Sequence, residues 1–112
     1  MLGYAIFNIN VNNPENYKEY VEKVKPTAER FGGEYLVRGG KNVIVEGSWQ
    51  HPRTVVIKFP SYDKAMEWYN SEEYKPIKNI RLDNADSNGM IIEGILRRKN
   101  VDIRKIRSCI KK

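Results

Sequence analysis

Residues 53–69, RTVVIKFPSYDKAMEWY, contain a strand, its end and the start of a helix in one run. The β-branched and aromatic residues of 53–59 predict a strand. Pro60 ends it, because proline has no N–H to give to a ladder of strand hydrogen bonds. Ser61 is a good N-cap, and the apolar spacing from residue 62 to 69 predicts a helix after it.

A strand followed by a helix also occurs nearer the N-terminus. Residues 3–11 alternate between apolar and more polar side chains, which predicts a half-buried strand. Asn13 caps the next helix and Pro14 takes its first position. The helical pattern continues to the glycine pair at Gly32, and we expect the helix to bend or break at Pro26.

The remaining segments complete an alternating order of strands and helices. A strand, a turn and a return strand are predicted at 35–38, 39–42 and 43–46, a second helical start at Ser71, a polar stretch at 83–89 and a last strand at 90–95. The order β-α-β-β-α-β is that of a ferredoxin-like split βαβ fold, an α+β class with an antiparallel sheet and two helices on one face.

The second face of this sheet is also apolar in the sequence pattern. Each predicted strand has apolar side chains on both of its sides: Phe7 and Ile9 against Tyr4 and Ile6, Val55, Ile57 and Phe59 against Val56, and Met90 and Ile92 against Ile91 and Ile95. An extended apolar face usually marks an interface, so we expect a homodimer that closes a barrel. A monomer whose second face is covered by its own C-terminal segment is the alternative.

Composition excludes several classes of site. The 112 residues suffice for one domain, and a single Cys109 and a single His51 exclude multi-cysteine and paired-histidine metal sites. We therefore expect neither a metal nor a cofactor. No apolar run is long enough to span a membrane and no signal peptide is recognisable, so we expect a cytoplasmic protein.

The basic charge is concentrated at one end of the chain. The formal net charge is +6, but residues 96–112 hold eight of the 20 basic side chains and one of the 14 acidic ones. Residues 1–95 are therefore nearly neutral, and we expect them to form the domain and 96–112 to form a basic tail. The tail is a short amphipathic helix if it is helical, and it either packs on the body as a strap or binds nucleic acid or a membrane.

Four separated motifs carry a resemblance to a known family. They are 31–40, FGGEYLVRGG; 45–49, VEGSW; 55–61, VVIKFPS; and 68–74, WYNSEEY. In this order they resemble the domain-of-unknown-function 1330 family, over about residues 3–95. The resemblance implies a dimeric α/β barrel, with a ligand cleft between the sheet and the helices. Wider relatives include cofactor-free monooxygenases, haem-degrading enzymes and small-molecule isomerases.

Five residues are candidates for a ligand site. Arg38, at the end of a strand, offers a planar fork for an anion, or else makes a structural ion pair. With a turn centred on Gly40 and Lys41 it opposes Val43; a slip or a bulge reverses its face. Tyr69 and Tyr74 offer hydroxyl groups and Trp49 a wall, unless these rings simply fill the core. Glu46 is the one candidate base.

These observations predict a small-molecule-binding protein that acts on, or simply binds, a small organic acid or aromatic compound. Cofactor-independent catalysis is open. The alternative is a non-enzymatic interaction protein whose basic tail contacts nucleic acid, a membrane or a partner protein.

Overall fold

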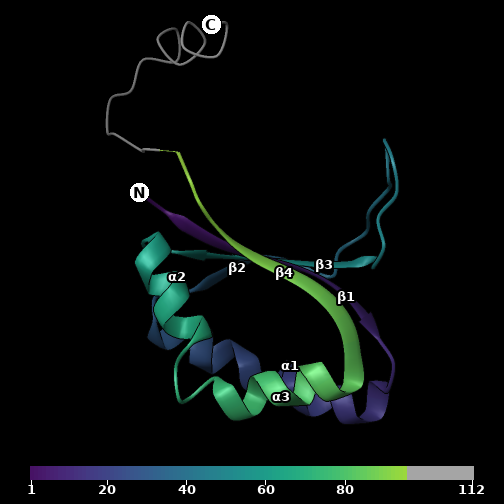
Figure 1. Ribbon diagram of the computed structural model, residues 1–112, viewed down its shortest axis with the longest axis horizontal. Coiled ribbons are helices and arrows are strands. Elements are labelled where there is room, and N and C mark those ends of the chain that lie inside the picture. Colours follow the sequence, from purple (N-terminus) through teal and green to yellow (C-terminus); the bar gives the residue numbers. More distant parts are fainter. Residues whose placement is uncertain (96–112) are drawn as a thin grey trace, which may run out of the picture.

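The computed structural model describes residues 1–95, which form one sheet of four strands with three helices on one of its faces (Figure 1). In chain order the elements are β1 (Gly3–Val11), α1 (Pro14–Arg30), β2 (Glu34–Arg38), β3 (Arg53–Phe59), α2 (Tyr62–Tyr69), α3 (Lys75–Asn84) and β4 (Ala85–Glu93).

The sheet has the strand order β2-β3-β1-β4, and its three strand pairs are antiparallel. With one helical segment after β1 and another after β3, this is the ferredoxin-like α+β fold that the sequence predicts. Alternation in β1 buries one side of the strand against the helices, as expected. The other side of the strand lies on the outer face of the sheet.

The first helix begins as predicted but does not break at Pro26. The Asn13 side chain accepts a hydrogen bond from the backbone N–H of Asn16 at 3.2 Å, and Pro14 follows as the first helical residue. Although Pro26 lies inside α1, the helix continues to Arg30. Buried residues on either side of the proline, Val24 and Thr27, hold this part of the helix against the core.

The second helical segment has two parts, joined by a turn. Ser61 caps α2, accepting a hydrogen bond from the N–H of Lys64 at 3.0 Å. The chain leaves the helix after Tyr69, and the Ser71 hydroxyl accepts from the N–H of Tyr74 at 3.2 Å. Ser71 thus holds the turn, but α3 itself begins only at Lys75, so the predicted start at Ser71 is four residues too early.

The predicted return strand at 43–46 is wrong, because these residues form no strand with the rest of residues 1–95. The partner of β2 is β3, and Arg38 lies opposite Val55 instead of Val43. An irregularity in the register between Tyr35 and Val37 sets this pairing. It places Arg38 on the helical side together with Tyr35, the reversal that a bulge produces.

The last strand begins five residues earlier than predicted. Residues 85–89 belong to β4, because α3 runs directly into it and Ala85 pairs with Val11 at the far end of β1. The polar stretch is compatible with a strand at this place because β4 is an edge of the sheet. Asn88 donates to the Asn8 side chain of β1 at 3.2 Å.

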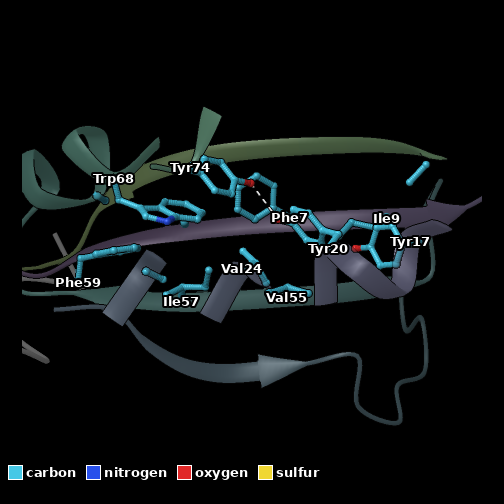
Figure 2. Packing of buried hydrophobic residues seen from close by; sticks show 14 residues of the cluster. Phe7, Ile9, Tyr17, Tyr20, Val24, Val55, Ile57, Phe59, Trp68 and Tyr74 are labelled. Atoms are coloured by element: carbon cyan, nitrogen blue, oxygen red, sulfur yellow. Dashed lines mark hydrogen bonds between the residues drawn. The ribbon is translucent and has the colours of Figure 1, made fainter. Parts of the chain in front are cut away.

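Aromatic side chains fill the space between the helices and the sheet (Figure 2). Trp68, Tyr74 and Phe59 are fully buried, and the Trp68 ring lies 4.3 Å from that of Tyr74 and 5.4 Å from that of Phe59, centroid to centroid. The Trp68 indole N–H donates to the Thr27 hydroxyl at 3.1 Å, which satisfies its buried polar group.

The predictions for the basic tail, 96–112, lie outside the described residues. Among the helices of residues 1–95, none has the length and the apolar character that crossing a bilayer requires.

Candidate functional site

A cavity of about 340 Å³ lies on the helical side of the sheet, between β4 and the helices α2 and α3. Apolar side chains make most of its wall, with a hydroxyl, a phenol and a guanidinium among them. The lining residues are Phe7, Met66, Tyr69, Arg81, Leu82, Ser87, Gly89, Met90 and Ile91.

Gly89 helps to leave this space open. It lies opposite Phe7 in the pairing of β1 with β4, and a Cβ at Gly89 would come within 2.5 Å of the Phe7 ring. The Phe7 ring therefore lies over Gly89, and the side chain of any other residue at position 89 would displace the ring. The wall of the cavity depends on this close approach.

Arg81, in the last turn of α3, is the unusual residue of the cavity. Only 3% of it is exposed, although it carries a charge at any physiological pH. One of its terminal nitrogens donates to the Ser87 hydroxyl, and its guanidinium carbon lies 4.9 Å from the centre of the Phe7 ring. Its Nε has no hydrogen-bond partner, and Arg81 makes no ion pair with any side chain of residues 1–95.

Burial of the Arg81 guanidinium costs free energy unless a further group pairs with it. A buried charge needs a counter-charge and hydrogen bonds to offset the loss of water. The tyrosines near Arg81 do not supply one, since burial raises the pKa of both Tyr20 and Tyr74 and keeps their hydroxyls protonated. The part of the chain that the structure describes therefore presents an uncompensated cation at the wall of an apolar cavity.

The two tyrosines predicted for the site lie in different surroundings. Tyr69 lines the cavity and stacks on Phe7 with ring centres 6.4 Å apart, and the Lys78 ammonium lies 4.3 Å from the centre of the Tyr69 ring. Tyr74 is fully buried behind the cavity, and its hydroxyl is hydrogen-bonded to that of Tyr20 at 2.8 Å, the dashed line in Figure 2.

Arg38 lies elsewhere and already has partners. Its guanidinium donates to the backbone carbonyl of Val21 at 2.7 Å and lies 4.8 Å from the centre of the Tyr35 ring. The space beside it, between α1 and the sheet, is only about 10 Å³ and does not admit an organic molecule. The structure thus separates Arg38 from Tyr69.

Glu46 and Trp49 lie in the segment that joins β2 to β3. Both line an open groove of about 450 Å³, together with Val37 and Thr54 of the sheet. Trp49 is half exposed there. The five predicted residues therefore occupy four separate places, and Tyr69 alone lies at the cavity that holds Arg81. Within residues 1–95, no three histidine, cysteine, aspartate or glutamate side chains gather as a metal site would require.

The sequence contains a signal for Arg81, which is not among the five predicted residues. Tyr74 and Ile77 begin the apolar stripe of α3, and Arg81 follows Ile77 by four residues, on the same helical face. A lone arginine at a position of the buried stripe indicates either a buried ion pair or a binding site. The sequence does not show that the partner is missing.

Known structures share this fold at low sequence identity. A protein of unknown function from Rhodopseudomonas palustris, RPA0582, is 16% identical with a TM-score of 0.67, over 86% of this chain and 84% of that one. A dimeric ferredoxin-like protein of unknown function from Jannaschia sp. CCS1 is 10% identical with a TM-score of 0.65, over 86% and 100%. A variant of SnoaB, a cofactor-independent oxygenase from Streptomyces nogalater, is 8% identical with a TM-score of 0.60, over 90% and 98%.

No curated protein of known function matches the sequence. The family described as "Domain of unknown function (DUF1330)" matches residues 2–95, which is nearly all of the chain outside the basic tail. The protein belongs to this family.

Proposed function

We propose that the protein binds a small organic anion with an apolar body in the cavity at Arg81. The observation that carries this proposal is the buried guanidinium whose Nε has no partner among residues 1–95. A carboxylate or enolate beside the guanidinium would supply the missing counter-charge. The apolar walls would cover the rest of the ligand, and about 340 Å³ is enough for a compact molecule.

Arg81, rather than Arg38, is the proposed anchor for the anion. Arg38 has a backbone acceptor and an aromatic face, whereas Arg81 has an unsatisfied nitrogen at the wall of the larger cavity. Ser87 holds the guanidinium in place and Tyr69 closes one side of the cavity. Trp49 and Tyr74 do not line this space, so their predicted contacts with a ligand have no support from the cavity.

Catalysis without a cofactor is compatible with this site. A cofactor-independent oxygenase has the same fold. A fixed cation in an apolar cavity favours a substrate that becomes negative, such as an enolate. Among residues 1–95, no carboxylate or imidazole lines the cavity as a candidate base. Glu46, the predicted base, lies in another groove of the protomer, and its catalytic role remains a prediction.

Calorimetric titration with benzoate and with uncharged benzamide tests the anchor. We expect benzoate to bind to the wild type and to bind at least about tenfold more tightly than benzamide, because only the acid offers a charge to Arg81. Arg81→Met should abolish the preference for benzoate. The matched variant Arg38→Met should retain it.

The reverse pattern, loss of benzoate binding in Arg38→Met alone, would contradict the assignment and restore Arg38 as the anchor. Arg81→Met should also fold, since a methionine replaces a buried charge that residues 1–95 leave unpaired. We expect its melting temperature without ligand to equal or exceed that of the wild type. If Arg81→Met does not fold, Arg81→Lys takes its place in the titration, because lysine keeps the positive charge.

We also propose that the protein is a homodimer in which the outer faces of two sheets meet. Large apolar side chains on this face are exposed in the protomer, with 58% of Met90 and 46% of Ile92 in contact with solvent. The Jannaschia protein, which has the same fold, is described as dimeric, and this supports a dimer. The alternative function, a tail that contacts nucleic acid or a membrane, remains a prediction from the charge of residues 96–112.

A further inference from the structure

The 14 residues between β2 and β3, residues 39–52, leave the sheet as an arm (Figure 1). The arm rises on the side of the sheet that faces away from the three helices. Its apolar side chains are far more exposed than such residues usually are: 80% of Val43, 84% of Val45 and 49% of Trp49 are accessible. Nothing in residues 1–95 covers them.

The backbone fixes the base of the arm and leaves its middle without a partner. Gly39 and Gly47 have positive φ angles, of 69° and 67°, and they delimit the segment that contains the three consecutive β-branched residues 43–45. The Gly39 N–H donates to the Thr54 carbonyl at 2.8 Å, and the Asn42 side chain donates to the Pro52 carbonyl at 3.2 Å. The base is thus held to β3, while 43–46, a strong strand sequence, forms no ladder within residues 1–95.

The exposed side of the arm continues into the outer face of the sheet. Val37 and Thr54 form one wall of the groove whose other wall is the arm. From Val37 an apolar row crosses all four strands, since the register pairs Val37 with Val56, Val56 with Ile6 and Ile6 with Met90. The arm and the apolar row therefore form one continuous surface, bordered by Lys41 and Glu46 of the arm and by the ion pair of Lys58 with Glu34 on the sheet.

The size of this surface indicates what covers it. Four strands about 4.8 Å apart and about seven residues long present a face of roughly 400–450 Å² per protomer, or under 900 Å² in a pair. A specific interface buries about 1,200–2,000 Å² in total. The flat outline of the two sheet faces alone is below this range, and an interface that also includes the two arms would be larger.

We propose that the arm of each protomer reaches over a second copy of this chain and adds residues 43–46 to that copy's sheet as an intermolecular strand. A second copy fits because each protomer carries the same largely apolar surface. A two-fold axis brings these two equal surfaces into contact. Strand addition satisfies the free backbone groups of 43–46 and those of a sheet edge together. This inference rests on the proposed dimer.

Light scattering of the full chain at micromolar concentrations tests the proposal with the double variant Val43→Asp/Val45→Asp. Both side chains are more than three-quarters exposed in the protomer, so the fold should be unaffected. We expect the wild type at twice 13.1 kDa and a dimer dissociation constant raised at least about 100-fold in the variant, because two carboxylates would be buried without partners. Tyr62→Asp, which puts the same change on the exposed surface of α2, should leave the dimer intact.

Different results would contradict the dimer, the role of the arm and the intermolecular strand. A wild-type mass of 13.1 kDa at every concentration would overturn both the dimer and the arm. A double variant that dimerises as tightly as the wild type would overturn the arm alone. Hydrogen exchange then tests the strand itself: the amides of 43–46 should exchange slowly in the wild-type dimer, and fast exchange there would show that the arm packs without forming a strand.

Discussion

At the residue scale, the two arginines show what the sequence allows and what it does not. The sequence predicts that an arginine at the end of a strand needs a partner, and Arg38 has two, Val21 and Tyr35. It also places Arg81 on a buried helical stripe. Whether a buried arginine has a counter-charge depends on which side chains the fold brings near it, and no spacing along the chain shows that.

The same scale gives a prediction for Thr27, whose hydroxyl accepts from Trp68 and donates to the Val24 carbonyl at 2.6 Å. Thr27→Val should cost about 1–3 kcal/mol, because it leaves a buried indole N–H without an acceptor. Thr27→Ser keeps the hydroxyl and should cost less than about 1.5 kcal/mol for the lost methyl group. Urea unfolding of the two variants measures the difference, and equal losses would show that this hydrogen bond contributes nothing to the free energy of unfolding.

At the scale of elements, strands whose side chains alternate in the sequence were predictable, whereas the start of β4 and the lack of a strand at 43–46 were not. β1 and β3 show their alternation in sequence because one of their sides is buried by the protomer's own helices. The start of β4 is polar because it lies at an edge, so its strand character comes from pairing with β1 rather than from its side chains. The segment 43–46 shows the opposite case, a strand sequence without a strand partner among residues 1–95.

Helix α1 gives the prediction that belongs to this scale. Pro26 lies in the helix interior and is exposed, so it removes the hydrogen bond to the Glu22 carbonyl without packing into the core. Pro26→Ala should raise the free energy of unfolding by about 1–3 kcal/mol, since the gain in helix propensity exceeds the roughly 0.4–1 kcal/mol that proline contributes by restricting the unfolded chain. Lys25→Ala, at the exposed neighbouring position, should change stability by less than about 0.5 kcal/mol. A loss of stability in Pro26→Ala would mean that the proline fixes a helix shape that the core requires.

At the scale of the whole molecule, the two faces of the sheet separate the two proposed activities. The cavity with Arg81 lies between the sheet and the helices, whereas the apolar row and the arm lie on the other face. Met90, on the edge strand β4, borders both, because it lines the cavity and ends the apolar row. Variants of Arg81 on one face and of Val43 and Val45 on the other should therefore separate anion binding from dimerisation.

The buried tyrosines of the core give the last prediction, which concerns the pH range of the folded protein. Burial raises the pKa of Tyr17, Tyr20 and Tyr74 above the usual value of 10.0. Below pH 10 these hydroxyls are protonated in both the folded and the unfolded chain, so their contribution to stability is fully present. Above pH 10 the unfolded chain loses their protons first, and stability falls as the pH rises toward the folded-state pKa values.

Each such tyrosine should lower the free energy of unfolding by about 1.4 kcal/mol per pH unit in that range. Urea unfolding between pH 8 and 11 should thus show a plateau followed by a steep decline, with roughly pH 10 as the point of change. Tyr20→Phe removes one of these groups and breaks the 2.8 Å hydrogen bond to Tyr74, so it should lower the plateau and make the decline less steep. Tyr62→Phe, on the exposed surface of α2, should follow the wild-type curve, and an identical decline in Tyr20→Phe would mean that the buried pair does not control alkaline unfolding.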